Sequence, residues 1–249
     1  MTQNGETLRL VALGFDAVDP VALARWWAAA LGWEVGDETG ASVALVPTDA
    51  TRFTVVFRPT TAAKGAAQNR IHLDLTTTSL DDQNESVERL IHLGGRHIDI
   101  GQRDDEEHVV LADPEGNELC IIEPTNNFLA GCGRFGSITC DGTREVGYFW
   151  SAALGWPLVW DQDEETAIRD AAGDGPLITW GGPPVAPKHG RNRLHLELAP
   201  PEHREVRAEI DRLVALGAVR LGEIDGEGGG DWVDMIDPDG NEFRILTSR

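Results

Sequence analysis

The apolar positions of the chain follow two spacings, one typical of helices and one typical of strands. Residues 21–31 place five apolar side chains at helical spacing, and Gly32 stands where a helix would end. Residues 71–75 alternate instead, so that three aliphatic side chains point to one face while His72 and Asp74 point to the other. Further strands are predicted at residues 42–47, 53–57, 109–112 and 119–122. The pattern predicts a unit of one strand, one helix and three strands.

The sequence repeats itself. The run WWAAALGW at residues 26–33 returns as FWSAALGW at 149–156, an offset of 123 residues (149 − 26). NRIHLDL at 69–75 returns at the same offset as NRLHLEL. DPEGNE at 113–118 returns as DPDGNE, with the offset longer by one residue. A weaker repeat of strand and helix within each half indicates that each half consists of two related modules.

These repeats predict two domains of similar length. The segment 126–137, NNFLAGCGRFGS, is rich in glycine and small residues and shows no sustained apolar period, which is typical of a linker. We therefore expect one domain at residues 1–125 and a second at 138–249, joined by this linker.

Composition narrows the classes of function. The 249 residues include 21 Lys and Arg against 42 Asp and Glu, a net charge of −21, which makes nucleic acid and anionic membranes poor partners. The charge can attract a cationic ligand or simply keep the protein soluble. The three cysteines fit neither a disulfide framework nor a structural zinc motif, and residues 1–10 lack the features of a signal peptide. We expect a cytoplasmic location.

The repeated motifs resemble the vicinal oxygen chelate superfamily, which includes glyoxalase I, extradiol dioxygenases, and fosfomycin and bleomycin resistance proteins. The similarity is greatest to its glyoxalase-like domains, here in tandem. The resemblance implies an α+β fold in which paired βαβββ modules form cup-shaped sheets, and it says little about the reaction, because this scaffold supports unrelated chemistries. Family members often build cups across a dimer interface, so we expect a monomer that acts as an internal pseudo-dimer, or a weak homodimer.

The resemblance also implies where a metal would bind. In glyoxalase I the ligands lie on the first and last strands of the modules, positions that fall here near Ala12 and Phe135 and at Cys120 and Arg244. The strand at 53–57, which should hold a further position, contains no His or Glu.

Of the family's ligand positions, only His72 and His195 match. A catalytic divalent ion normally takes about three protein ligands, so we expect no metal and no other cofactor. The alternative is that Glu118 and Cys120, neighbours on one strand face, join His72 around an ion.

Polar side chains of the predicted cups are the candidate site. We expect His72 and His195 to contact a ligand or to transfer a proton, with Asp74 or Glu197 tuning their charge. A purely structural hydrogen-bonding network explains the same residues equally well. The other candidate ligand-binding residues on these faces are Glu118, Cys120, Glu242 and Arg244.

Each of these candidates has a structural alternative. Cys120 can be a thiolate near His72 or a buried apolar thiol. Arg244 can clamp an anionic group of a ligand or pair with Glu197 or Glu242.

Two tryptophans complete the candidate set. Trp180, in a short strand, and Trp232, after the glycine-rich stretch 226–230, can line the mouth of a cup and stack on a planar ligand. The triple glycine at 228–230 can act as a flap. The leading hypothesis is a metal-independent small-molecule binding protein, such as one that sequesters an antibiotic or a toxic metabolite. The alternative is a glyoxalase-related lyase or isomerase that uses His72 or His195 as acid or base.

Overall fold

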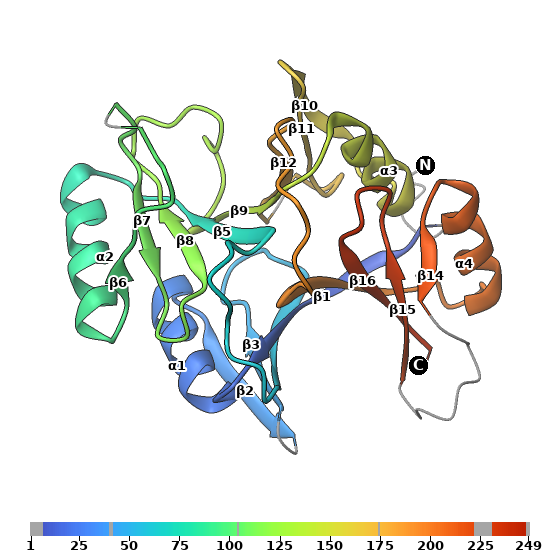
Figure 1. Ribbon diagram of the computed structural model, residues 1–249, viewed down its shortest axis with the longest axis horizontal. Coiled ribbons are helices and arrows are strands. Elements are labelled where there is room, and N and C mark those ends of the chain that lie inside the picture. Colours follow the sequence, from blue (N-terminus) through green and yellow to red (C-terminus); the bar gives the residue numbers. More distant parts are fainter. Residues whose placement is uncertain (1–6, 40–41, 104, 174, 222–230, 248–249) are drawn as a thin grey trace.

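The chain folds into four copies of one unit, a strand followed by a helix and three strands (Figure 1). The computed structural model describes residues 7–39, 42–103, 105–173, 175–221 and 231–247. The first unit contains β1 (Arg9–Ala17), α1 (Pro20–Leu31), β2 (Glu34–Thr39), β3 (Ser42–Val46) and β4 (Thr54–Pro59). The second contains β5 (Ile71–Leu75), α2 (Leu80–His92), β6 (Arg96–His97), β7 (Val109–Ala112) and β8 (Glu118–Ile121).

The second half of the chain repeats this order. Its first unit contains β9 (Phe135–Cys140), α3 (Arg144–Leu154), β10 (Leu158–Gln162), β11 (Glu165–Ile168) and β12 (Leu177–Trp180). Its second contains β13 (Leu194–Ala199), α4 (Val206–Ala215), β14 (Val219–Leu221), β15 (Trp232–Ile236) and β16 (Glu242–Leu246). The predicted α+β class and order of elements are confirmed. Because β9 begins at Phe135, the last three residues of the predicted linker belong to a strand.

The repeated Leu-Gly pairs end helices. Helix α1 begins after Asp19, whose side chain accepts a hydrogen bond from the Ala22 amide at 3.0 Å, and Pro20 occupies its first turn. It ends at Gly32, whose φ of 74° lies in the left-handed region that glycine adopts without strain. Gly155 ends α3 in the same way, with a φ of 67°.

Two eight-stranded sheets result, and each combines strands from both halves of the chain. Sheet A runs in the order β14-β15-β16-β13-β1-β4-β3-β2, and sheet B in the order β10-β11-β12-β9-β5-β8-β7-β6. The halves meet where β1 pairs antiparallel with β13 and where β5 pairs antiparallel with β9. Both sheets are therefore built from the first module of one half and the second module of the other.

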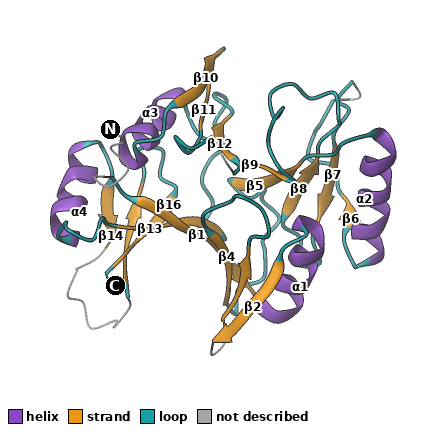
Figure 2. Cartoon of the chain, turned by 180° about the vertical axis from the view of Figure 1, so that it is seen from behind, coloured by secondary structure: helices purple, strands orange, loops and turns teal. Residues whose placement is uncertain are grey.

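The two modules of one half are held together by their helices and by a repeated hydrogen bond. The Trp27 indole donates to the Asp113 carboxylate at 3.0 Å, and Trp150 donates to Asp237 at 3.1 Å. Figure 2 shows α1 and α2 on one side of the molecule and α3 and α4 on the other, with the strands between them. The repeated tryptophans and DPxGNE turns thus fasten each half.

One face of each sheet is buried against helices, and the other forms a cup. Strand alternation sends Leu13, Phe15 and Phe57 into the apolar core, whereas Gly14 and Arg58 lie on the opposite face of sheet A. We call the faces turned away from the helices cup A, on sheet A, and cup B, on sheet B. No helix among the described residues has the length and hydropathy of a membrane span.

Candidate functional site

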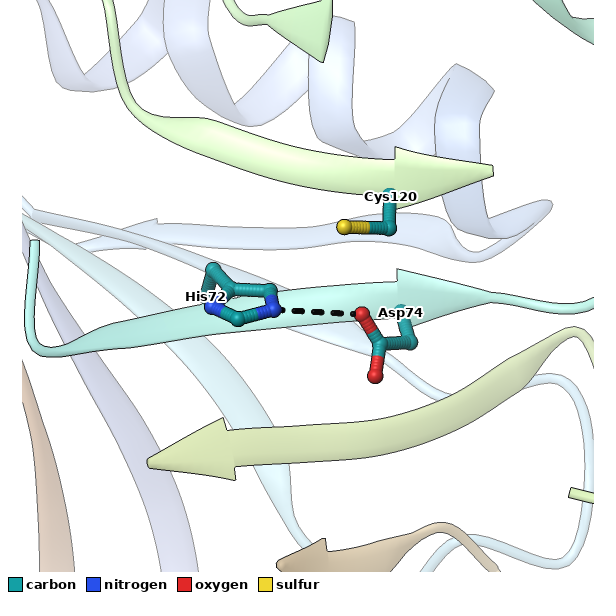
Figure 3. Close-up of side chains that lie close together, drawn as sticks. All are labelled: His72, Asp74 and Cys120. Carbon is teal, nitrogen blue, oxygen red and sulfur yellow. Dashed lines mark ion pairs between the residues drawn. The ribbon is translucent and has the colours of Figure 1, made fainter. Parts of the chain in front are cut away.

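Three side chains of the first half meet in the centre of cup B (Figure 3). His72 and Asp74 alternate onto this face of β5, and Cys120 lies beside Asp74 on the neighbouring strand β8. His72 Nε2 is 3.4 Å from Asp74 Oδ1. One nitrogen, oxygen or sulfur atom from each of the three lies within 4.8 Å of the others. The structure thus brings together three of the predicted site residues.

The second half of the chain completes this centre with hydroxyl groups. Ser137 Oγ and Thr139 Oγ1, on β9, each donate to Asp74 Oδ2 at 2.6 Å. Thr179, on β12, donates to the Thr139 hydroxyl at 3.1 Å. Sequence reasoning missed these three residues, because the register of β9 against β5 joins segments of different halves. Alternation on β9, which sends Ser137 and Thr139 to one face, was the available signal.

The surroundings of His72 and Asp74 shift the pKa values of these two side chains in opposite directions. Burial alone would lower the pKa of His72, but its hydrogen bonds to Asp74 and Cys120 raise that pKa well above 6.5. Burial would likewise raise the pKa of Asp74, but His72 and the two hydroxyls lower it. His72 is therefore an imidazolium at neutral pH, paired with an ionised carboxylate.

The rest of cup B is apolar. Burial raises the pKa of the Cys120 thiol despite the nearby His72, so this cysteine is a neutral thiol. It belongs to a small apolar cluster, formed by side chains from strands of both halves and by the segment between β8 and β9. The cluster contains Val110, Cys120, Ile122, Leu129, Ala167 and Leu177, with Ile98, Ile100, Cys132 and Trp160 at its border.

A cavity of about 1160 Å³ reaches His72. It lies between two segments that join the modules of each half, residues 60–70 and 181–193, which we call the arms. His72 and Thr139 form part of its wall, and 28% of the His72 side chain is exposed. The cavity gives a small molecule access to the His72 end of cup B.

Cup A has an equivalent histidine that is sealed. His195 Nε2 lies 3.1 Å from Glu197 Oε1, and only 1% of the histidine side chain is exposed. Glu197 also pairs with Arg58 at 2.7 Å and with Arg244 at 3.5 Å. Burial lowers the pKa of His195, opposed by its hydrogen bond to Glu197 and reinforced by the charge of Arg244. His195 is therefore neutral, and no ligand can reach it in this structure.

A row of alternating charges covers cup A. Arg244 Nε is 3.0 Å from Asp234 Oδ1, and Arg191 approaches the same oxygen at 3.2 Å. The Trp232 ring packs against the guanidinium carbons of Arg58 and Arg244, at 5.6 and 4.7 Å from its centroid. The predicted stacking surface of Trp232 is thus occupied by two arginines of the protein itself.

The two glutamates of the repeated turns lie apart from the histidines. Glu118 pairs with Lys64 at 2.7 Å and accepts from the Asn69 amide. Glu242 repeats the arrangement with Lys188 and Asn192. Both carboxylates anchor an arm to a strand end. The structure therefore does not bring Glu118 to His72, as the predicted alternative metal set required.

The remaining predicted positions lie elsewhere. Trp180 is 1% exposed and packs in the apolar core, on the face of β12 opposite to Thr179, so it does not line a cup mouth. The predicted flap at 228–230 lies outside the described residues. All three cysteines are free.

A glyoxalase-type metal does not fit either cup. In cup A the last-strand position holds Arg244, and its guanidinium together with that of Arg58 repels a cation. In cup B, Asp74 comes close to His72 and Cys120, but its carboxylate is already bonded by two hydroxyls and faces the imidazolium. Burial raises the pKa of the Cys120 thiol, and the side chains that β9 and β12 place around the pair are hydroxyls rather than imidazoles or carboxylates.

Comparison with known proteins supports the fold. The glyoxalase-like domain family matches residues 12–122 and again 137–246. No curated protein matches the sequence. Glyoxalase I from Zea mays superimposes with a TM-score of 0.62 at 12% identity, covering 96% of this chain and 92% of that one. A putative dioxygenase from Bacillus subtilis gives a TM-score of 0.62 at 14% identity, covering 97% and 85%.

Proposed function

The chain belongs to the family of glyoxalase-like domain proteins, and we propose that it binds a small molecule in cup B without the help of a metal. The ligand enters from the cavity between the arms and contacts His72. Sequestration of an antibiotic or a toxic metabolite is the biological role that such binding without turnover would serve.

The difference in exposure between the two equivalent histidines carries this proposal. His72 is 28% exposed and borders a cavity of about 1160 Å³, whereas His195 is 1% exposed behind two arginines. Ligand pockets combine a largely apolar wall with a few polar groups that orient the ligand. The cavity wall combines small apolar residues of the two arms, among them Ala62, Ala66 and Pro187, with polar groups that include His72.

The charge state of the pair indicates how the ligand is held. The imidazolium of His72 and the carboxylate of Asp74 neutralise each other, so the pair offers the ligand a hydrogen bond and no net charge. Charged groups of both signs stand elsewhere in the cavity wall, among them Asp16, Lys64 and Arg70. The acidic character of the whole chain, which favours a cationic ligand, is therefore a weaker guide than the composition of the cavity wall.

A second candidate is a glyoxalase-related lyase or isomerase, and one observation favours it. Because the pKa of His72 is raised, this residue holds a proton at neutral pH beside the cavity, as a general acid must. His195 is unable to serve in this way, because it is buried and neutral.

The first test separates metal-dependent from metal-independent function. Protein purified without a tag or chelator is subjected to elemental analysis before and after incubation with Ni²⁺, Zn²⁺, Mn²⁺ and Fe²⁺. We expect no stoichiometric metal. Binding of one ion per chain that is lost in His72→Ala would overturn the metal-independent proposal and make metal-assisted catalysis the leading function.

The second test uses the two histidines as a matched pair. Compounds that raise the thermal midpoint of the protein are titrated against the His72→Gln and His195→Gln variants by calorimetry. We expect His72→Gln to weaken binding and His195→Gln to preserve it, with no product formed from the bound compound. Equal affinities in all three proteins would overturn binding at cup B, and turnover that collapses in His72→Gln would establish the enzyme instead.

A further inference from the structure

The carboxylate of Asp74 is held by the opposite half of the chain. Its Oδ2 accepts hydrogen bonds from both Ser137 and Thr139 at 2.6 Å, while Oδ1 faces His72 at 3.4 Å. Ser137 is fully buried, and the hydroxyls of Ser137 and Thr139 lie 3.1 Å apart. This arrangement orients the carboxylate toward the histidine.

The number of protons that each group carries determines which group donates and which accepts in these hydrogen bonds. A hydroxyl has one proton, and Thr139, which accepts from Thr179, gives its own to Asp74. An ionised carboxylate only accepts, so the nitrogen of His72 that faces it, Nε2, must carry a proton. The other ring nitrogen of the imidazolium, Nδ1, also carries a proton and is the donor that remains for a ligand.

We propose that Ser137 and Thr139, supported by Thr179, are positioning residues that orient Asp74 and thereby hold the His72 ring with its Nε2–H toward the carboxylate. They touch no ligand themselves and act through Asp74. The inference extends the proposed function, because it assumes that His72 meets the ligand, but the orientation of the pair can be measured without any ligand.

The fold does not require these hydroxyls. By strand register, Thr139 corresponds to Gly14, because these residues pair with His72 and His195, and Ser137 corresponds to Ala12, because these pair with Asp74 and Glu197. Thr179 corresponds to Val56, which lies beside Gly14 as Thr179 lies beside Thr139. The same strand pairing therefore forms without a hydroxyl at any of these positions. This favours a role in the chemistry of cup B over a role in building the sheet.

Among the described residues, the strands beside His72 and Asp74 add one titratable group, and the other charged groups near the pair lie on the cavity wall. On the strands packed against β5, the titratable group that faces His72 and Asp74 is Cys120 of β8, while β9 and β12 contribute only hydroxyls. Charged or titratable side chains that share the cavity wall with His72 are Asp16, Lys64, Arg70, Cys140, Asp141, His189, Arg191 and Arg193. Thr139→Val leaves all of these residues unchanged.

The test is an NMR titration of His72 in the full-length protein. In Thr139→Val we expect the proton affinity of His72 to fall roughly tenfold, because Asp74 loses a charge-assisted hydrogen bond and turns away from the imidazole. Thr139→Ser should restore the titration. Thr54→Val, which removes a hydroxyl of sheet A bonded to the Val11 carbonyl, is the control and should leave it unchanged.

An unchanged His72 titration in a folded Thr139→Val protein would overturn the inference. If this variant fails to fold, Ser137→Ala serves the same test, with the folded state checked by amide spectra. Ligand affinity measured in parallel separates the two proposals. A shifted titration with unchanged affinity supports the positioning role and contradicts binding through His72.

Discussion

The two cups derive from the same repeated sequence but stabilise a buried carboxylate in different ways. In cup B the carboxylate of Asp74 accepts hydrogen bonds from two hydroxyls and is close to an imidazolium. In cup A, Glu197 is close to two guanidiniums and a neutral imidazole. The partners of the buried carboxylate, rather than the histidine itself, therefore determine whether a ligand can reach the cup.

Side-chain size explains why the two solutions exclude each other. Glu197 and His195 pack directly over Gly14, where an added Cβ would lie 2.3 Å from His195 Nε2 and 2.5 Å from Glu197 Oε1. Thr139 occupies the corresponding position of β9, opposite His72, and donates a hydrogen bond to the shorter Asp74. Large cationic side chains fill cup A, while small hydroxyls leave cup B open at the His72 end.

The largest expected effect comes from removing the carboxylate of cup A. Glu197→Ala leaves Arg58 and Arg244 without their shared partner in a buried place, which should destabilise the protein by about 3–5 kcal/mol. Asp74→Ala removes only hydrogen bonds and one charge pair, and should cost about 1–3 kcal/mol. Urea denaturation of both variants measures the difference. Equal losses would contradict the view that the arginines make cup A the more rigid structural site.

The next effect tests the packing over Gly14. Gly14→Ala should destabilise the protein by about 2–3 kcal/mol, because the new methyl group must displace His195 and Glu197. Gly65→Ala is the control, since no atom lies within 4 Å of an added Cβ there. Its unfolding free energy should stay within about 0.5 kcal/mol of wild type. A neutral Gly14→Ala would show that cup A is less closely packed than described.

The two histidines should respond to pH in opposite directions. The raised pKa of His72 means that its contribution to stability is complete below pH 6.5 and is lost as the pH rises through the folded-state value. The lowered pKa of His195 means that the unfolded chain binds a proton first, so its contribution declines as the pH falls below 6.5.

Denaturation between pH 5.5 and pH 8, two values chosen on either side of the ordinary histidine pKa of about 6.5, checks both signs. The stability difference between wild type and His72→Gln should grow as the pH falls, and that for His195→Gln should shrink. Each unit between folded and unfolded pKa corresponds to about 1.4 kcal/mol. Parallel trends in the two variants would mean that the cups do not differ in protonation.

The smallest effect concerns the hydroxyl farthest from the pair. Thr179→Val copies the residue of cup A, Val56, and removes one neutral hydrogen bond to Thr139. The cost should be about 1 kcal/mol or less, measured by the same denaturation. A loss above about 2 kcal/mol would show that Thr179 supports more than this single bond.

Much of the architecture can be predicted from the sequence, for a physical reason. Strand alternation and helix-ending glycines are local signals, and they placed residues 71–75 and 109–112 in strands with the bounds that the structure has. Tandem repetition predicted the two glyoxalase-like domains, which the family match confirms.

The site could be predicted only in part, because its geometry depends on contacts between distant segments. Alternation correctly placed His72, Asp74 and Cys120 on one face. It also placed Glu118 on this face. Glu118 is the first residue of β8, however, where Lys64 of an arm reaches it, and the carboxylate pairs with Lys64 instead of His72. Similarly, alternation does not show that Arg58, from the other half, closes cup A over Glu197.

The exchange of modules between the sheets has a consequence for how such a protein can diversify. If two identical half-length chains formed these cups, every substitution would appear twice, once on each side of the symmetry axis. In the joined chain a substitution alters one cup alone, and thus Thr139 and Cys120 of cup B can differ from Gly14 and Arg244, which occupy the equivalent positions of cup A. One cup has become an internal clamp that fastens the two halves, which leaves the other free to specialise.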